Sequence, residues 1–268
     1  MTASRAAATP ADGLRFAFGT LTVLPVRVTR WDRPAARAGM VWAPLAGLVV
    51  GLCGAAAGGA LLLLGCGPLL AAAGTVAVPA ALTRGLHLDG LADTADGLGS
   101  GRPAEDALRI MRQSDIGPFG VLTLVLVLIG QVAAVAGAYG TSWTRGAAGF
   151  AVASVAARTA MTLACRDGVP AARPEGLGAA VAGAVPARAA WGVAAAVVVL
   201  CAAAGLPFGP YAAAQFAAAA LIALGAGELL LRRCRARLGG VTGDVFGALC
   251  ETAGTAALVV LAAGGATG

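Results

Sequence analysis

Three aspartates stand close together in the run His-Leu-Asp-Gly-Leu-Ala-Asp-Thr-Ala-Asp-Gly at residues 87–97. On an α-helix, Asp93 would lie about 40° from Asp89, and Asp96 about 20° on the other side of Asp89. Carboxylates this close disfavour one another's ionisation unless a cation neutralises them, and hard oxygen ligands suit Mg²⁺ or Mn²⁺. A calcium loop would need acids at alternate positions and a glutamate at the twelfth. The run therefore predicts a divalent-cation site, with a solvated acidic helix face as the alternative.

A second acidic signal is the run Leu-Gly-Gly-Val-Thr-Gly-Asp at residues 238–244. If a helix begins near Asp244, Glu251 lies two turns further along on the same face. The alternative for Asp244 is an N-cap of the last apolar helix. The arginines just before this run are numerous enough to bind phosphate groups as well as to set membrane topology. They are Arg232, Arg233, Arg235 and Arg237.

Arginines elsewhere in the chain give two further candidate functional sites. Arg109 and Arg112 are about one helical turn apart and could meet a pyrophosphate, or could extend to lipid head groups. Arg158 lies inside an apolar run, and a charge within a membrane helix predicts a functional site. Its alternative is a structural ion pair with Glu228.

The residue types that the chain lacks narrow its chemistry. All 19 residues counted as Lys plus Arg are arginine, and His87 is the single histidine. Without lysine there is no Schiff base and no Gly-rich loop ending in Gly-Lys, and one histidine excludes a multi-His zinc or iron site. The net charge of +6 accompanies no basic run interleaved with aromatic residues, so no nucleic-acid partner is expected. Carboxylates, arginines, hydroxyls and a bound metal remain.

The elements that must position these residues are membrane helices, because the chain is 59% hydrophobic and only 12% charged. Crossing about 30 Å takes about 20 helical residues. Seven apolar runs approach that length, and the second is the weakest, because it is short and contains two prolines. Ahead of them, residues 1–39 are expected to lie on the membrane surface. The runs cover residues 40–64, 66–83, 119–138, 147–165, 189–206, 212–231 and 246–263.

Seven crossings would place 17 of the 19 arginines on one side of the membrane. The positive-inside rule makes that side cytoplasmic, with the N-terminus inside. Eleven of the 13 acidic residues follow, and residues 84–118 are expected to form a cytoplasmic acidic catalytic loop and helix. The sequence thus predicts that residues 1–268 form a single all-α, polytopic transmembrane helix bundle. Any catalysis is therefore expected at the cytoplasmic face.

The acidic run, together with several separated motifs, resembles the cobalamin synthase family. The other motifs occur in the expected order: Leu-Pro at 24–25, Pro-Leu-Ala-Gly at 44–47, Ile-Met-Arg at 110–112, Glu-Gly-Leu-Gly at 175–178 and the run at 238–244. One departure is that the family commonly has Asp-Ser-Arg where this chain has Gln113, Ser114 and Asp115. For that reason neither Gln113 nor Asp115 is given a site role.

The resemblance implies an enzyme that joins adenosylcobinamide-GDP to α-ribazole, or to its 5′-phosphate, and releases GMP with the help of Mg²⁺. Such a transfer needs positioning and charge neutralisation more than covalent catalysis. On this reading Asp89, Asp93, Asp96 and Asp244 hold one or two Mg²⁺ ions, with Mn²⁺ as a substitute. Either Asp96 or Asp244 takes the hydroxyl proton, and His87 orients a substrate group or acts as base. The substrate contacts would come from Arg112, Ser114, Arg158, Glu175, Thr242 and Glu251.

Two other functions are weighed against this one. A lipid phosphotransferase of the CDP-alcohol type uses a similar acidic motif, but the chain lacks that family's full spacing. A secondary transporter is suggested by Arg158 and Glu228 within apolar runs, yet no repeat of two similar halves is evident. Membrane lipid is an expected partner in every case, and homo-oligomerisation is left open.

Overall fold

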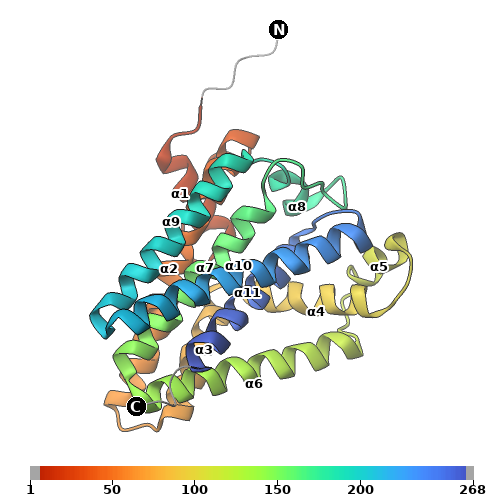
Figure 1. The fold of residues 1–268 in the computed structure, drawn as a ribbon. Helices are drawn as coiled ribbons and strands as arrows, with labels where there is room; N and C mark the ends of the chain where they lie inside the picture. Colours follow the sequence, from red (N-terminus) through yellow and green to blue (C-terminus); the bar gives the residue numbers. More distant parts are fainter. Residues whose placement is uncertain (1–6, 264–268) are drawn as a thin grey trace.

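The computed structural model describes residues 7–263, and every regular element in that range is a helix (Figure 1). This confirms the predicted all-α class. The elements are α1 (Pro10–Leu21), α2 (Arg33–Leu63), α3 (Pro68–Leu82), α4 (Leu86–Gly99), α5 (Ala104–Ile110), α6 (Pro118–Thr141), α7 (Trp143–Ala164), α8 (Gly176–Val181), α9 (Ala187–Gly205), the short 3₁₀ helix η1 (Leu206–Phe208), α10 (Pro210–Leu238) and α11 (Gly243–Ala263).

Six of these helices are long and apolar enough to cross a membrane: α2, α6, α7, α9 together with η1, α10 and α11. They correspond to six of the seven predicted runs. The exception is α3, whose 15 residues extend only about 22 Å, less than the hydrocarbon core. It reaches the length of a seventh span only when joined to α4, from which it is bent by 88°. The predicted run at residues 66–83 is thus a short helix that forms a bent pair with α4, and counting that pair as one span gives the predicted seven.

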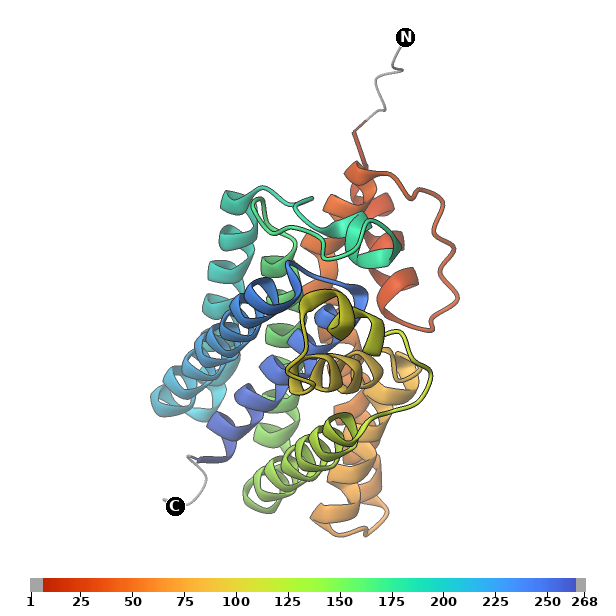
Figure 2. The same cartoon turned by 90° about the vertical axis from the view of Figure 1, so that its right-hand side faces the viewer.

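The break between α3 and α4 sets the direction of the acidic run. Arg84 and Gly85 both have positive φ angles, 51° and 71°. Glycine adopts this conformation freely, whereas for arginine it is strained. Two successive left-handed residues end α3 and start α4 on a new axis. As a result, α4 lies across the bundle beside α6 and α11, which Figure 2 shows from the side of α4.

Helix α7 forms the centre of the bundle. It packs against α2, α6, α9, α10 and α11, and 83% of its most apolar 18-residue stretch is buried. Small residues permit this packing: a Cβ atom on Gly47 of α2 would come within 2.5 Å of the carbonyl oxygen of Ser154. Close contact through small residues is the usual way in which helices associate in a bilayer.

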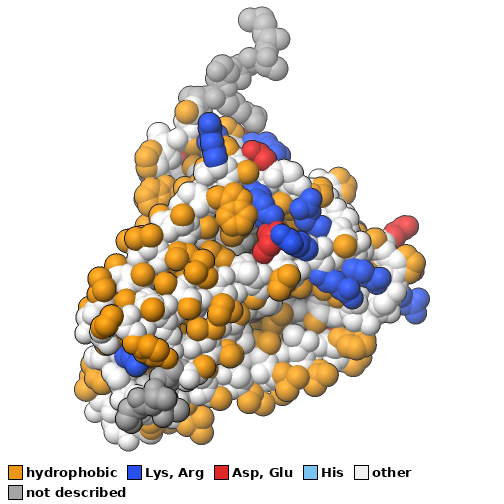
Figure 3. Space-filling view, in the orientation of Figure 1, with side chains coloured by type: hydrophobic (Ala, Val, Ile, Leu, Met, Phe, Trp, Pro, Cys, Tyr) orange, Lys and Arg blue, Asp and Glu red, His pale blue; other side chains and the backbone are white. Residues whose placement is uncertain are grey.

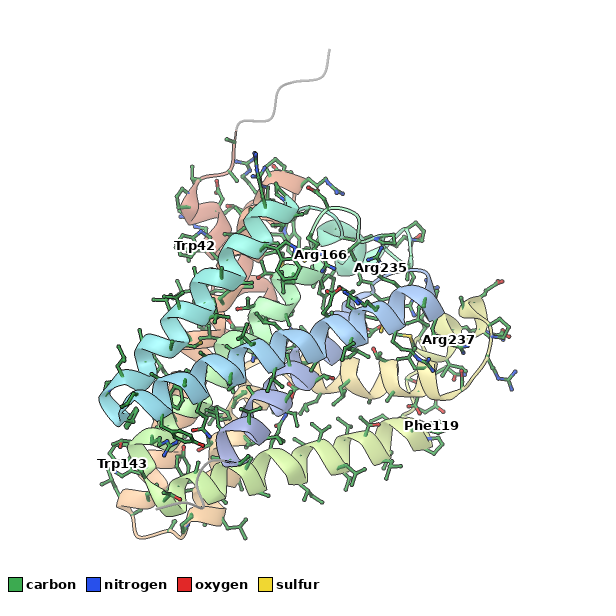
Figure 4. All side chains as sticks on the ribbon, viewed as in Figure 1. Trp42, Phe119, Trp143, Arg166, Arg235 and Arg237 are labelled. Carbon is green, nitrogen blue, oxygen red and sulfur yellow. The ribbon has the colours of Figure 1, made fainter. Side chains whose placement is uncertain are left out.

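Charged side chains gather toward one end of the molecule. On the face drawn in Figure 3, the basic side chains lie mostly toward the upper right, where Figure 4 labels Arg166, Arg235 and Arg237. The opposite end, near Trp143, is largely hydrophobic. On the face drawn, most arginine side chains thus lie toward the same end of the molecule.

The predicted N-terminal surface segment includes a helix that packs on the bundle. In α1, Phe16 is 1% exposed and lies against Gly39 of α2. Helix α2 already begins at Arg33, so the last part of the expected segment 1–39 belongs to the first membrane helix. Residues 1–6 of that segment lie outside the described residues.

Candidate active site

Helices α4 and α11 touch through their backbones. A Cβ atom on Gly90 of α4 would lie 2.5 Å from the carbonyl oxygen of Asp244, and one on Gly247 of α11 would lie 2.9 Å from that of His87. No larger side chain fits between the helices at these two points. The crossing brings the start of α11, with Asp244, beside the carboxylates of α4.

The pKa of the half-buried Asp93 carboxyl depends on the charges around it. Burial raises its pKa from 3.8 to about 7, and the neighbouring charges of Asp89, Asp244 and Asp96 contribute in that order. Arg173 acts in the opposite direction and is the weakest of these influences. The structure therefore gathers the four predicted acids into one region of excess negative charge, which favours a bound cation.

The first turn of α11 is built so that the Asp244 side chain is available to this region. The hydroxyl of Thr242 accepts the backbone N–H of Val245 at 3.2 Å and donates to Asp244 Oδ2 at 3.1 Å. Thr242, which is 3% exposed, is thus the side-chain cap of the helix. The alternative in which Asp244 itself caps the helix is wrong, because Thr242 is the N-cap residue.

Arg173 is a site residue that the sequence did not single out. Its Nη1 atom lies 3.6 Å from Asp244 Oδ2, and its Nη2 atom donates to the carbonyl of Leu108 at 2.6 Å. The contact depends on a backbone bridge between Ala171 and Val241, which lays the loop before α8 over the start of α11. Burial lowers the pKa of Arg173. A tertiary bridge of this kind leaves no periodic signal in the sequence.

Asp96 has a different position from the other three acids. Its side chain accepts the backbone N–H of Gly117 at 2.8 Å and that of Gly120 at 2.9 Å, one on each oxygen. These groups belong to the start of α6, and the carboxyl is 6% exposed. Asp96 therefore acts as an N-cap supplied from another helix, a role that the dipole of α6 also favours.

Replacing Asp96 with alanine is expected to destabilise the protein by about 1–2 kcal/mol, because one buried and one partly buried backbone donor at the start of α6 lose their acceptor. Asp96→Asn keeps one acceptor and should cost less. Thermal unfolding in detergent measures both changes. An unchanged unfolding midpoint together with lost activity would instead place Asp96 in the chemistry.

Two predicted residues, His87 and Arg158, meet inside the bundle, away from the carboxylates. His87 follows the opposite face of α4, about 200° from Asp89. Its ring is 2% exposed, and its Nδ1 atom lies 3.3 Å from the guanidinium of Arg158. Glu251 accepts a bond from Gln131 of α6 at 2.9 Å. Arg158 and Glu251 line one small, partly open pocket of about 40 Å³, enough for only one or two waters.

This internal group resembles a metal site in geometry but not in charge. The ligand atoms of His87, Cys250 and Glu251 lie within 4.8 Å of one another. The Nδ1 atom of that histidine is in contact with the positive guanidinium of Arg158, whose charge opposes a cation there. The expected alternative pair of Arg158 with Glu228 is also not found, because Glu228 bonds to Arg166 at 3.0 Å.

The remaining predicted substrate residues lie on exposed connections. Arg112 is exposed, and its positive charge contributes to lowering the pKa of Arg173. Ser114 and Glu175 are exposed, and within residues 7–263 their side chains make no hydrogen bond or ion pair. The Gly178 that follows Glu175 has a clear packing role, since a Cβ atom there would come within 2.7 Å of the Thr242 backbone.

The acidic region offers oxygen donors of the kind that a hard divalent cation prefers, but among residues 7–263 no three of its carboxylates bring their oxygens within 4.8 Å of one another. Asp89, Asp93 and Asp244 supply carboxylate oxygens, and their mutual repulsion is what such an ion would relieve. Mg²⁺ commonly binds proteins through one or two carboxylates and completes its shell with water and substrate phosphates. An open cluster is therefore better suited to it than a closed cage. Figure 2 shows how α4 is presented at the side of the bundle.

Comparisons of the sequence with known proteins all identify similarity to one enzyme family. The sequence model described as "Cobalamin-5-phosphate synthase" matches residues 13–262. Proteins named adenosylcobinamide-GDP ribazoletransferase are similar over nearly the whole chain. One from Frankia casuarinae is 42% identical, covering 92% of this chain and 93% of its own; one from Nocardioides sp. is 41% identical, covering 94% and 99%. Another from Bradyrhizobium diazoefficiens is 42% identical, covering 93% of each. No solved structure matches the chain.

Proposed function

This chain belongs to the cobalamin-5-phosphate synthase family, and from that membership we propose that it is an adenosylcobinamide-GDP ribazoletransferase. It transfers the adenosylcobinamide phosphate group from adenosylcobinamide-GDP to α-ribazole or its 5′-phosphate. The observation in the structure that supports this most is the carboxylate region at the crossing of α4 and α11. A phosphotransfer between anionic groups needs charge neutralisation at one point, and this region provides the ligands for it.

In the reaction, an oxygen of the ribazole hydroxyl forms a bond to the phosphorus nearest cobinamide. The bond from that phosphorus to the GMP oxygen breaks, and GMP leaves. We assign Asp89, Asp93 and Asp244 as the residues that would hold Mg²⁺, which when bound neutralises charge on the pyrophosphate oxygens. Arg173 holds the Asp244 carboxylate through its ion pair and adds a positive charge on the same side.

Of the two acids considered for the hydroxyl proton, Asp244 is the better placed. Both oxygens of Asp96 already accept backbone N–H groups, whereas Asp244 has one oxygen outside the bond from Thr242. His87 and Arg158 we assign to positioning, because their contact joins α4 to α7 on the face of α4 away from Asp89. Their replacement should alter the placement of the carboxylates without removing a group that touches substrate.

Six helices that could cross a membrane support a multi-pass membrane enzyme. We propose further that it lies in the bacterial inner membrane with the arginine-rich end and the carboxylate region facing the cytoplasm. The positive-inside rule supports this orientation. Labelling of single introduced cysteines on the two ends, in intact cells, tests it directly.

The test of the function is conversion by the purified protein in detergent or nanodiscs. Supplied with adenosylcobinamide-GDP and α-ribazole, it should form adenosylcobalamin and GMP in equal amounts. Activity with CDP-diacylglycerol as donor, and none with the cobinamide substrate, would contradict the proposal and favour a lipid phosphotransferase.

Chelation is expected to abolish this conversion and added Mg²⁺ to restore it, because the substrate pyrophosphate and the carboxylates repel one another without a cation. Mn²⁺ should substitute at least in part, and Ca²⁺ poorly, since its longer bonds to oxygen suit a larger cage. Product formation is measured after passage through a chelating resin and again after each ion is added. Full turnover in the resin-treated protein would contradict metal dependence.

A further inference from the structure

A cavity of about 630 Å³ opens beside the carboxylate region. Its wall is formed by the end of α1, the break between α3 and α4, and the start of α6, and it includes Asp89. Small-molecule sites usually have volumes of roughly 300–1,000 Å³. The cavity is thus large enough for a substantial part of a nucleotide, and it reaches one of the acids assigned to the reaction.

Arg84 is the one basic residue and Asp89 the one acidic residue among the described residues that line this cavity. The two side chains are exposed and do not pair with each other, and within residues 7–263 the guanidinium of Arg84 makes no hydrogen bond or ion pair. The apolar part of the wall includes Leu86, Leu88 and Ile116. Such a wall suits a ring system or an aliphatic edge, and the arginine suits an anion.

The backbone at Arg84 is unusual in its own right. Arg84 is the only residue other than glycine with a positive φ angle in the described chain, at 51°. Glycine or asparagine would occupy this position with less strain. Strained residues of this kind gather at ligand sites, and here the strain coincides with the break that presents Arg84 on the cavity wall.

From these observations we infer that Arg84 binds a phosphoryl group of a substrate in this cavity, next to Asp89. The inference rests on the proposed function and names a phosphate-binding residue for it. Two substrates contain a phosphoryl group that an arginine could bind: adenosylcobinamide-GDP, in its pyrophosphate, and α-ribazole 5′-phosphate, in its 5′-phosphate. Unphosphorylated α-ribazole has no phosphoryl group, so comparing the two acceptors shows which substrate Arg84 binds.

The experiment measures KM and kcat of the full-length protein for each substrate, with Arg84→Gln, Arg84→Lys and Arg84→Gly. Arg188→Gln, on an exposed arginine at the start of α9, is the matched control. For Arg84→Gln we expect KM of the phosphate-bearing substrate to rise roughly 10- to 100-fold, as when a charged hydrogen bond is lost. Arg84→Lys should recover part of this, and kcat should change much less.

The KM values for the donor and for the acceptor show which substrate supplies the phosphate that Arg84 binds. If Arg84 binds the donor, the KM for adenosylcobinamide-GDP rises whichever acceptor is used, and equilibrium binding of that donor weakens by a similar factor. If it binds the acceptor, only the KM for α-ribazole 5′-phosphate rises, and the preference between the two acceptors is lost. Either result supports the inference.

Arg84→Gly separates binding from folding. It removes the guanidinium and the backbone strain together, so its thermal midpoint should equal or exceed that of the wild type while its KM rises as in Arg84→Gln. Unchanged KM and binding in all three variants, with an active wild type, would overturn the inference alone, and a change only in the response to anionic lipid would reassign Arg84 to head groups. An inactive wild type would instead count against the proposed function.

Discussion

Asp93→Asn is expected to reduce cobalamin formation by at least about 100-fold. Loss of an outer-shell partner at a metal site typically costs 10- to 100-fold in affinity or activity, and Asp93 is assigned to the inner shell. Its carboxyl is at the centre of the acidic region, since it experiences the charges of Asp89, Asp244 and Asp96. The amide keeps the size and one oxygen but loses the charge. The rate is measured with saturating substrates over a series of Mg²⁺ concentrations.

The same variant should not destabilise the metal-free protein. In the folded state the pKa of Asp93 is raised from 3.8 to about 7, chiefly by burial. The folded protein holds this proton more tightly than the unfolded chain, so the stability that the group contributes falls as pH rises from about 4 to about 7. At pH 8, in the presence of chelator, Asp93→Asn should therefore melt at the same or a higher temperature than the wild type.

A stable but inactive Asp93→Asn protein would show that the acid is kept for function at a cost in stability. Glu105→Gln is a suitable control, because Glu105 is an exposed acid in α5 that is not assigned to the site. It should retain near-normal turnover. If Asp93→Asn also turned over normally, Asp93 would have to be removed from the assigned ligands.

Gly90→Ala is expected to remove most activity through the backbone alone. The added Cβ atom would lie 2.5 Å from the carbonyl oxygen of Asp244 and 2.9 Å from its Cα atom. Both are backbone atoms, so the clash cannot be relieved by a side-chain rotation. The helices must separate, which moves Asp89 and Asp93 away from Asp244. Displacements of about 1 Å near reacting groups can cost roughly 100-fold in rate, and overpacking adds about 1–3 kcal/mol of destabilisation.

Gly130→Ala is the matched control for this prediction. Gly130 also lies inside a helix, α6, but a Cβ atom there would meet nothing within 4 Å. This variant should be as stable as the wild type and fully active. Product formation and the thermal midpoint are measured together for both variants. Normal activity of Gly90→Ala would mean that α4 and α11 are further apart than described.

The sequence predicted the helix that carries the acidic run because a helix depends on local spacing. The intervals between Asp89, Asp93 and Asp96 predict a shared helix face, and the structure confirms a helix over Leu86–Gly99. The same periodicity places His87 about 200° from Asp89, in agreement with its separation from the aspartates of α4. The short apolar run with two prolines likewise agrees with α3 being too short to span alone.

Other features depend on contacts between distant segments and left no local pattern. The capping role of Asp96 needs Gly117 and Gly120, which are 21 and 24 residues further along. The approach of Arg173 to Asp244 needs a bridge between two loops. Only a three-dimensional arrangement distinguishes these residues from other acids and arginines in the same motifs.

The central claim is that the carboxylates of α4 and α11 together form one divalent-cation site. Titration of the purified protein with Mn²⁺, followed by electron paramagnetic resonance, tests it without relying on turnover. The wild type should bind Mn²⁺ in competition with Mg²⁺, and Asp93→Asn and Asp244→Asn should each weaken that binding by at least about 10-fold. Equal Mn²⁺ binding by the wild type and both variants would contradict the account.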